Sequence, residues 1–300
     1  MDEMTLLRDF RSDAPTAAPP AMRARALDAA PTRRRRPALR LAVAAALAVT
    51  GGGVAATVLQ PASPSAAAVL TRVAATISTE PALTPDPHQW IYQKVLSRDS
   101  YTGQPGTHPG ESWSRFDGEL SGGRLPSGRV LVQGIEYSPL GTPQQWYDML
   151  TGLPDDPTAA LSYLEADPLY TSKGTTRADR EFDEVTEALT ADTYLPPESR
   201  SSLFRALAVI PGVGIDEHAA PDLVGRPVLS VTFTGDTDLG RAGDRWELLL
   251  DPATYDVFGL RGTAGSDIDL GDGTIAHSGE VWYEDAVLDH RVVDHAGDVS

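Results

Sequence analysis

One apolar stretch, Ala38–Leu59, constrains the layout of the whole chain. It contains one Arg near its start and otherwise only Ala, Leu, Val, Gly and Thr. As a helix that rises ~1.5 Å per residue it would be about 30 Å long, which matches the hydrocarbon thickness of a bilayer. The stretch at 38–59 is therefore predicted to be a single transmembrane helix.

Arginines predict the orientation of this helix. Five of them lie before it or in its first turn, and no comparable cluster follows: Arg33, Arg34, Arg35, Arg36 and Arg40. Basic residues beside a membrane segment favour the cytoplasmic side. We therefore expect a largely disordered cytoplasmic tail at 1–37, a short linker at 60–64, and an extracytoplasmic domain at 65–300 that is held at the plasma membrane.

Two other interpretations of the apolar stretch stay open. A cleaved signal peptide could use the small residues Ser65–Ala68 as its cleavage site, and Arg33–Arg34 resembles a twin-arginine signal. However, the preceding tail is long, and the apolar run exceeds the ~7–15 residues of a usual signal peptide core. A buried helix of a soluble domain would not explain the adjoining arginines. The sequence favours an uncleaved anchor over both.

Charge and composition exclude several classes of function. The 300-residue chain has a net charge of −17 and no Cys. Residues 1–40 carry nine Arg and five acids, a balance of +4, which leaves −21 for the remainder. An anionic outer domain repels nucleic acid, so no nucleic-acid partner is expected. The lack of Cys excludes disulfides, thiolate metal sites and a Cys nucleophile.

Residue patterns predict an α+β outer domain. Helical periodicity and N-terminal caps, such as Thr142 and Asp156 before Pro, indicate helices at 66–79, 144–151, 158–166, 178–191 and 197–209. Period-two patterns indicate strands at 90–97, 112–117, 129–137, 213–218, 227–234, 245–251, 257–263 and 275–293, with a break in the last around Asp285. The short loops between the late strands favour an antiparallel, curved sheet that packs on the helices.

The sequence lacks the motifs of common catalytic and cofactor sites. There is no G-x-S-x-G elbow, no H-E-x-x-H zinc motif, and no phosphate-binding or dinucleotide-binding glycine pattern. His290 and His295 lie five residues apart, which would place them on opposite faces of a strand rather than around one metal ion. No cofactor and no catalytic residue are therefore expected.

A calcium loop is a weak candidate for a metal site. Asp267, Asp269 and Asp272 lie close together in the sequence DIDLGDG, and Asp236 and Asp238 lie in the similar DTDLG. The first segment has Gly and Asp exchanged relative to an EF-hand loop and lacks the Glu at the twelfth position. Both segments lie between predicted strands, where Asp and Gly are typical of turns, so the turn interpretation is favoured.

Acidic pairs support a different class of function, an exported hydrolase that acts on cell wall or glycan. Asp155–Asp156 and Glu284–Asp285 are adjacent carboxylates, and glycoside hydrolysis needs two carboxylates ~5–10 Å apart across a cleft. Five tryptophans could stack on sugar rings, although core packing also explains them. In a chain with 42 acidic residues such pairs also arise by chance.

Several segments run in a specific order through nearly the whole chain: MDEMTLLRDF, the Arg run and apolar stretch, DPHQWIYQKVLSRDS, GLPDDPTAALSYL, YLPPESRSSLFRALAVIPGV, DLVGRPVLSV and LLLDPATYDVFGLR. Together they resemble an uncharacterised family of actinobacterial single-pass membrane proteins. Members are often encoded beside an extracytoplasmic-function sigma factor, so the resemblance implies a role in envelope-linked regulation. The family supplies no catalytic residues. The tail lacks the His and Cys pattern of zinc-containing anti-sigma domains.

Two segments near the end, Val224–Pro227 and Leu250–Thr254, are similar to parts of lipoprotein carriers and of periplasmic regulators of sigma pathways. In those folds a half-barrel sheet wraps around helices and leaves an apolar groove. The resemblance implies the same arrangement here, although an ordinary hairpin turn explains the second segment equally well.

The sequence therefore predicts a non-enzymatic, membrane-anchored envelope regulator or ligand-binding sensor. Its expected partners are the lipid bilayer, a cytoplasmic regulatory protein such as a sigma factor that contacts residues 1–37, and an apolar ligand or envelope protein in an outer groove. The alternatives are the exported hydrolase and a structural anchor without a ligand. An apolar groove between helices and sheet would favour binding, whereas two inward carboxylates in a polar cleft would favour hydrolysis.

Overall fold

A computed structural model describes residues 64–98, 104–106, 108–135, 141–167, 172, 174–191, 193–271 and 273–299. The predicted tail, the predicted transmembrane stretch and the five arginines that predict its orientation lie outside these residues. Within the described residues, no helix is both long and apolar enough to cross a bilayer.

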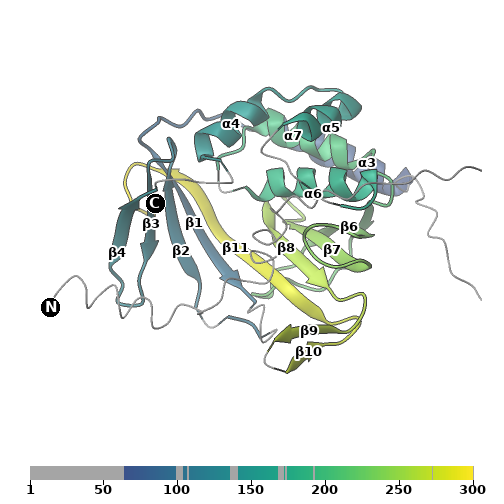
Figure 1. The fold of residues 1–300 in the computed structure, drawn as a ribbon. Coiled ribbons are helices and arrows are strands. Elements are labelled where there is room, and N and C mark those ends of the chain that lie inside the picture. The colour runs from purple at the N-terminus through teal and green to yellow at the C-terminus, as the bar shows by residue number, and fades with distance from the viewer. Residues whose placement is uncertain are drawn as a thin grey trace, which may run out of the picture. The chain divides into compact units, whose positions relative to one another are not determined.

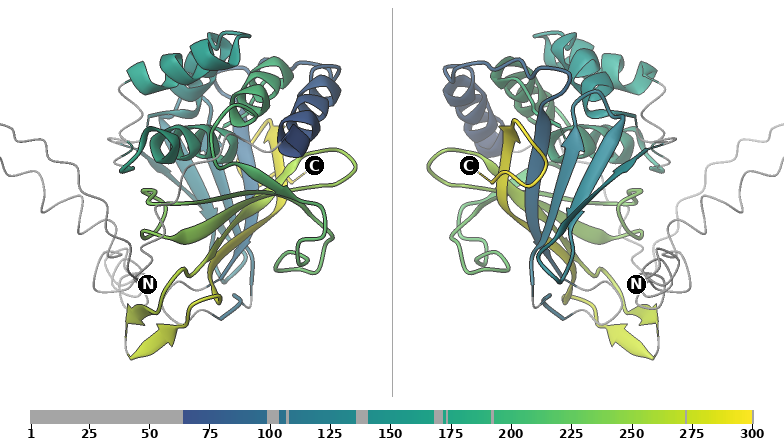
Figure 2. Two further views of the ribbon diagram at one scale, coloured as in Figure 1. Left: turned by 90° about the vertical axis from the view of Figure 1, so that its right-hand side faces the viewer. Right: turned by 90° about the vertical axis from the view of Figure 1, so that its left-hand side faces the viewer.

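The described residues form an α+β domain in which helices lie on one side of a large antiparallel sheet (Figures 1 and 2), which confirms this part of the sequence prediction. The helices are α3 (Pro64–Ile77), α4 (Pro143–Thr151), α5 (Pro157–Ala166), α6 (Arg177–Thr190) and α7 (Pro197–Leu207). The strands are β1 (Trp90–Ser97), β2 (Gly110–Arg115), β3 (Leu120–Arg124), β4 (Val130–Gly134), β5 (Gly214–Asp216), β6 (Leu229–Gly235), β7 (Asp244–Leu250), β8 (Val257–Thr263), β9 (Ile268–Gly271), β10 (Thr274–Ala276) and β11 (Val281–Val293).

The last strand joins two halves of one sheet. Among the described strands the order is β4-β3-β2-β1-β11-β8-β7-β6-β5, with β9 and β10 forming a separate hairpin. Strands β1 to β4 and β5 to β8 each form an antiparallel meander. The long strand β11 lies between the two meanders and pairs with β1 on one edge and β8 on the other, as Figure 1 shows.

Strands β11 and β8 separate along part of their length, and each has one extra residue there that shifts the register with its other neighbour. Pairing between them covers residues 281–286 of β11 and ends where Ala286 lies opposite Gly259. Beyond that point the register leaves Leu288 of β11 without a partner in β1, and Phe258 of β8 without a partner in β7. Extra residues of this kind bend a strand and increase its twist, so β11 leaves β8 and continues along β1.

Local sequence explains where the helices begin. Thr142 caps α4 through a capping box with Gln145, and Asp156 caps α5 by accepting a hydrogen bond from the amide of Ala159. Both helices have Pro at their first position, where its missing N–H costs nothing. These two caps confirm the sequence prediction. Thr176 caps α6 in the same way as Thr142 caps α4.

The main core lies between the helices and the β6–β8 half of the sheet. Alternate residues of each strand face the helices, so Phe233 of β6 stacks on Phe182 of α6 with ring centroids 4.6 Å apart. A smaller core lies around β1 and β2, where Tyr92 stacks on Trp113. The indole N–H of Trp113 donates to the carbonyl of Asp298, so the segment after β11 belongs to this smaller core.

The sequence prediction differs from the structure in three strands. Strand β3 lies between the predicted strands at 112–117 and 129–137, where the sequence predicts no strand, and β9 lies where it predicts a turn or calcium loop. Gly and Asp hide the alternating pattern of these two short strands. The expected break around Asp285 is wrong, because β11 continues through it and the break lies at 277–280 instead. At Asp285 the strand pairs with both neighbours, which outweighs the low strand preference of Asp.

A Gly259→Ala substitution is expected to destabilise the domain strongly. Gly259 has a φ of +144° and a Cβ built there would overlap the carbonyl oxygen of Asp285. We expect a loss of about 3 kcal/mol or more, measured by urea unfolding of the full chain. Gly279→Ala is the matched control, since Gly279 also has a positive φ but open space around it, and it should cost about 1 kcal/mol. Equal losses for both variants would contradict the steric argument.

Candidate functional site

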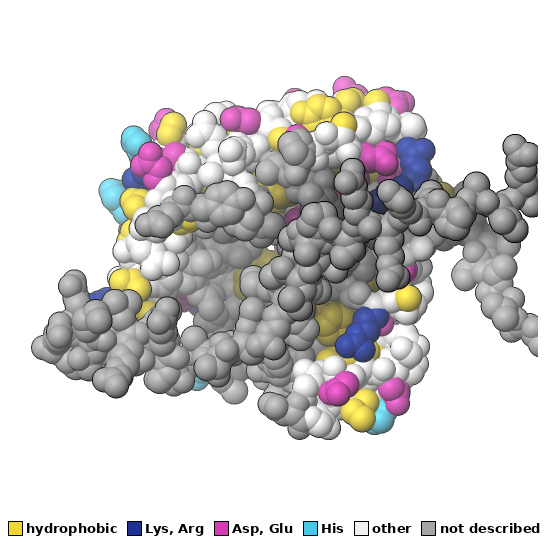
Figure 3. Space-filling model, viewed as in Figure 1, with side chains coloured by type: hydrophobic (Ala, Val, Ile, Leu, Met, Phe, Trp, Pro, Cys, Tyr) yellow, Lys and Arg dark blue, Asp and Glu magenta, His cyan; other side chains and the backbone are white. Residues whose placement is uncertain are grey.

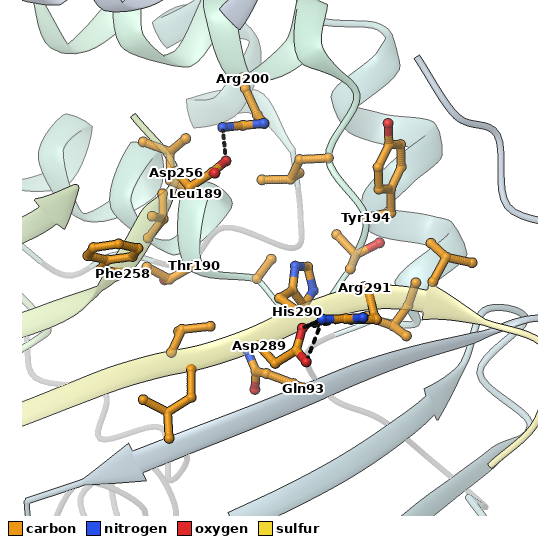
Figure 4. A pocket seen from close by; sticks show the side chains of 18 of the residues that line it. Gln93, Leu189, Thr190, Tyr194, Arg200, Asp256, Phe258, Asp289, His290 and Arg291 are labelled. Atoms are coloured by element: carbon orange, nitrogen blue, oxygen red, sulfur yellow. Dashed lines mark hydrogen bonds and ion pairs between the residues drawn. The ribbon is translucent and has the colours of Figure 1, made fainter. Parts of the chain in front are cut away.

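A cavity with a volume of about 600 Å³ lies between the helices and the sheet, where β11 and β8 separate. Helix α6, the segment after it, and the two strands supply most of its walls (Figure 4). Half of its lining residues are apolar: Leu83, Ile91, Leu189, Ala191, Leu195, Val257, Phe258, Val287, Leu288 and Val292. A cavity of this volume falls within the range of roughly 300–1,000 Å³ that small-ligand sites occupy.

Arg200 connects helix α7, on one side of the cavity, to the start of β8 on the other. From α7 its guanidinium reaches Glu80 at 2.9 Å and Asp256, just before β8, at 3.1 Å. Figure 4 shows the contact with Asp256 across the upper wall of the cavity. The Arg200 side chain is 15% exposed, and its guanidinium forms ion pairs with both carboxylates. Its charge is therefore already neutralised before any ligand enters.

Arg226 contacts both β8 and β11 where the two strands separate. Its Nη1 donates to the carbonyl of Val287 at 2.9 Å, and its guanidinium lies 3.7 Å from the ring centre of Phe258. The buried carboxylate of Asp222 fixes it, because Oδ2 accepts from Nε at 2.6 Å and Oδ1 from the backbone amide of Arg226 at 2.7 Å. One polar atom of this side chain, Nη2, is buried and has no described hydrogen-bond partner.

The polar residues of β11 divide between the two faces of the sheet. Asp289 and Arg291 form a bidentate ion pair with both distances at 2.7 Å. They lie on the face of Tyr92, whose pKa is raised by burial and by the nearby carboxylates of Glu111 and Asp289. His290 is exposed and points to the opposite face, into the cavity (Figure 4). Of these three side chains, the imidazole of His290 therefore points into the cavity.

The structure places two of the three metal candidates, Asp267 and Asp269, apart from the cavity. Asp267 accepts hydrogen bonds from the amide of Ser278 and lies 3.3 Å from His277, while Asp269 accepts from the amide of Gly271. The third candidate, Asp272, lies outside the described residues. No group of three or more His, Cys, Asp or Glu in the described part of the chain is arranged to hold a metal ion.

The two predicted histidines do not lie on one strand. His290 belongs to β11, whereas His295 lies beyond the end of that strand at Val293, with its Nδ1 3.3 Å from Asp298. The expectation that both occupy a strand is therefore wrong, because β11 ends two residues before His295.

The acidic pairs have structural contacts of their own. Asp156 is the cap of α5, and Asp155 lies 3.0 Å from Arg205 on the surface. Glu284 is buried beside Arg261, while Asp285 follows it on the opposite face of β11. Figure 3 shows acidic side chains spread over the visible face rather than gathered at one place.

Sequence reasoning missed the residues that shape the cavity. Arg226 was part of the noted Val224–Pro227 segment, but nothing in that segment indicates that its guanidinium reaches β11. The one available signal was the spacing of Asp222 and Arg226, since an acid four residues before Arg can hold it in place.

Comparisons with family models, with curated proteins and with solved structures gave no match for this chain.

Helix α6, which ends at the cavity, carries two buried acids whose protonation changes near neutral pH. Burial raises the pKa of Asp183 from 3.8 to about 7, although Ser172 and the amide of Asp238 donate to its Oδ2. Burial also raises the pKa of Glu184 to about 7, with Glu165 adding to the shift. The folded chain therefore retains protons that an unfolded chain releases between about pH 4 and pH 7.

Asp183→Asn is expected to stabilise the domain at pH 8 by about 1 kcal/mol or more, because it removes an uncompensated buried charge. The unfolding free energy of the parent chain should fall as pH rises from 4 to 7, so the advantage of the variant should shrink toward pH 4. Urea unfolding at several pH values measures this. Asp155→Asn is the control, because that side chain is 97% exposed. A stability difference that does not vary with pH would contradict the interpretation.

Proposed function

We propose that the described domain is the ligand-binding outer part of a membrane-anchored envelope regulator, and that it binds its ligand without changing it chemically. The observation that supports this proposal is the cavity of about 600 Å³ between helices and sheet. Its apolar walls favour ligand burial, and each buried CH₂ contributes about 0.8 kcal/mol. Its charged groups already have partners, as in the pairs of Arg200 with Asp256 and of Arg291 with Asp289.

The proposal for the rest of the chain rests on the sequence. We propose that residues 38–59 anchor the protein in the plasma membrane and that residues 1–37 contact a cytoplasmic regulatory protein, for which the resemblance to sigma-factor-associated proteins suggests a sigma factor. Because the Arg run precedes the apolar stretch, the described domain would lie outside the membrane.

Filling the cavity should abolish ligand binding. A photoreactive ten-carbon acyl probe, added to native membranes that contain the full chain, is expected to cross-link to residues 189–195 or 287–292. Val287→Trp should reduce these cross-links at least tenfold, because Val287 lines the cavity. Val209→Trp is the matched control, since Val209 is 44% exposed and lies outside the cavity. Both variants should keep the melting temperature of the parent within a few degrees.

Cross-links that are as strong in Val287→Trp as in the parent would contradict binding in the cavity. So would cross-links spread evenly over the surface of the domain. Mapping the modified residues by mass spectrometry separates these outcomes from simple uptake of the probe into lipid.

The topology has its own test. Protease added to intact cells is expected to digest residues 65–300 and to leave the tail protected. Replacing Arg33–Arg36 with Asn should at least halve the fraction of correctly oriented molecules, because the arginines hold the tail on the cytoplasmic side. The matched control replaces Arg8, Arg11, Arg23 and Arg25, which lie farther from the apolar stretch. An outer domain that is protected in intact cells would overturn both the topology and the proposed tail partner.

A further inference from the structure

The cavity lies over the face of the sheet where β1 and β11 pair. In the register of these strands Ile91 lies opposite Val292 and Gln93 lies opposite His290, so these four residues share one face. All four line the cavity, and Leu189 of α6 lines it from the helical side. An occupant of the cavity would therefore contact side chains of both layers.

Two of the three arginines that line the cavity are held by carboxylates of the protein itself. Arg200 lies 2.9 Å from Glu80 and 3.1 Å from Asp256. The Nε of Arg226 donates to the buried carboxylate of Asp222 at 2.6 Å. An anion that entered the cavity would therefore have to compete with carboxylates that are already in place.

The third arginine is paired as well, so the charges around the cavity sum to a small negative value. Arg291 binds Asp289 through two hydrogen bonds of 2.7 Å. Three arginines thus meet four carboxylates, a net charge of −1, and each of the four carboxylates has an arginine partner. His290, the other basic side chain on the wall, also has an interaction within the chain.

These pairs make a charge on the occupant unfavourable. A charged group that leaves water loses its hydration, and only an opposite charge or strong hydrogen bonds compensate for this loss. In the cavity each such opposite charge is already used by a partner. A neutral polar group loses much less hydration, and the side-chain amide of Gln93 is a group that can both donate to it and accept from it.

We propose that the cavity selects an uncharged ligand with an acyl chain and a neutral polar end, such as an amide or an ester, and that the paired carboxylates exclude anionic ligands. This inference rests on the proposed function and names the ligand class of the same site. The apolar walls would hold the chain of a fatty acid or of an anionic phospholipid equally well. The charge of the headgroup is therefore the feature on which the site discriminates.

The test compares three photoreactive probes that share one ten-carbon chain and end in a primary amide, a sulfonate or a trimethylammonium group. The full chain is held in phosphatidylcholine nanodiscs, and labelling is compared at equal amounts of disc-bound probe. Cross-links that disappear in Val287→Trp count as labelling of the cavity, because Val287 lines it. We expect the amide probe to label the cavity at least tenfold more strongly than either charged probe.

Removing the carboxylate partners of Arg200 should admit the anionic probe. The double variant Glu80→Gln, Asp256→Asn changes the net charge around the cavity from −1 to +1, so sulfonate labelling should rise at least fivefold and amide labelling should change less than twofold. Asp256→Asn alone keeps Glu80 on Arg200 and should give a smaller rise. Asp155→Asn is the matched control, since it removes a carboxylate from Arg205 outside the cavity and should change neither signal.

The outcomes separate this inference from the proposed function. Labelling by a charged probe that equals or exceeds labelling by the amide probe would overturn the selection of an uncharged ligand, while it would still support ligand binding in the cavity. A double variant that keeps the melting temperature of the parent and still excludes the sulfonate probe would overturn the role of the carboxylates. If the double variant does not fold, the single variant decides this point. If none of the three probes labels the cavity, both proposals fail.

Discussion

The separation of β8 from β11 is the constraint on which the rest of the arrangement depends. At Gly259 the backbone takes a conformation that L side chains rarely adopt and passes so close to Asp285 that a Cβ does not fit. Beyond this contact β11 no longer follows β8 and instead continues along β1 to Val293. One backbone feature therefore both joins the two halves of the sheet and opens the cavity between them.

Buried ions join β7, β8 and β11 two residues from the point where β8 and β11 separate. Arg261 of β8 lies directly opposite Glu247 of β7 and Glu284 of β11, and its guanidinium donates to Glu284 at 2.9 Å. The backbone carbonyls of Ala220 and Pro221 also accept from it. Burying these charges is costly unless every partner is present, so the network requires β7, β8, β11 and the loop before β6 to assemble together.

Sequence patterns predicted the local elements well and the long-range arrangement poorly. Strands at Trp90–Ser97 and Val257–Thr263 were predicted with their observed ends, because alternating apolar residues and nearby turn residues mark them. Nothing local indicates that β11 pairs with β1, about 200 residues earlier in the chain, because strand partners are chosen by the whole core. The cavity depends on this pairing and on two unpaired residues, Phe258 and Leu288, so its position could not be predicted.

The helical layer gives the cavity a direct physical connection to the part of the chain that follows the predicted anchor. Helix α3 begins at Pro64, soon after the apolar stretch, and packs on α7, where the hydroxyl of Ser201 donates to the carbonyl of Ala74 at 2.8 Å. One residue before Ser201, Arg200 leaves α7 on the cavity side and binds Asp256 at the start of β8. Two adjacent residues of α7 therefore contact both the start of β8 at the cavity and the helix that follows the predicted anchor.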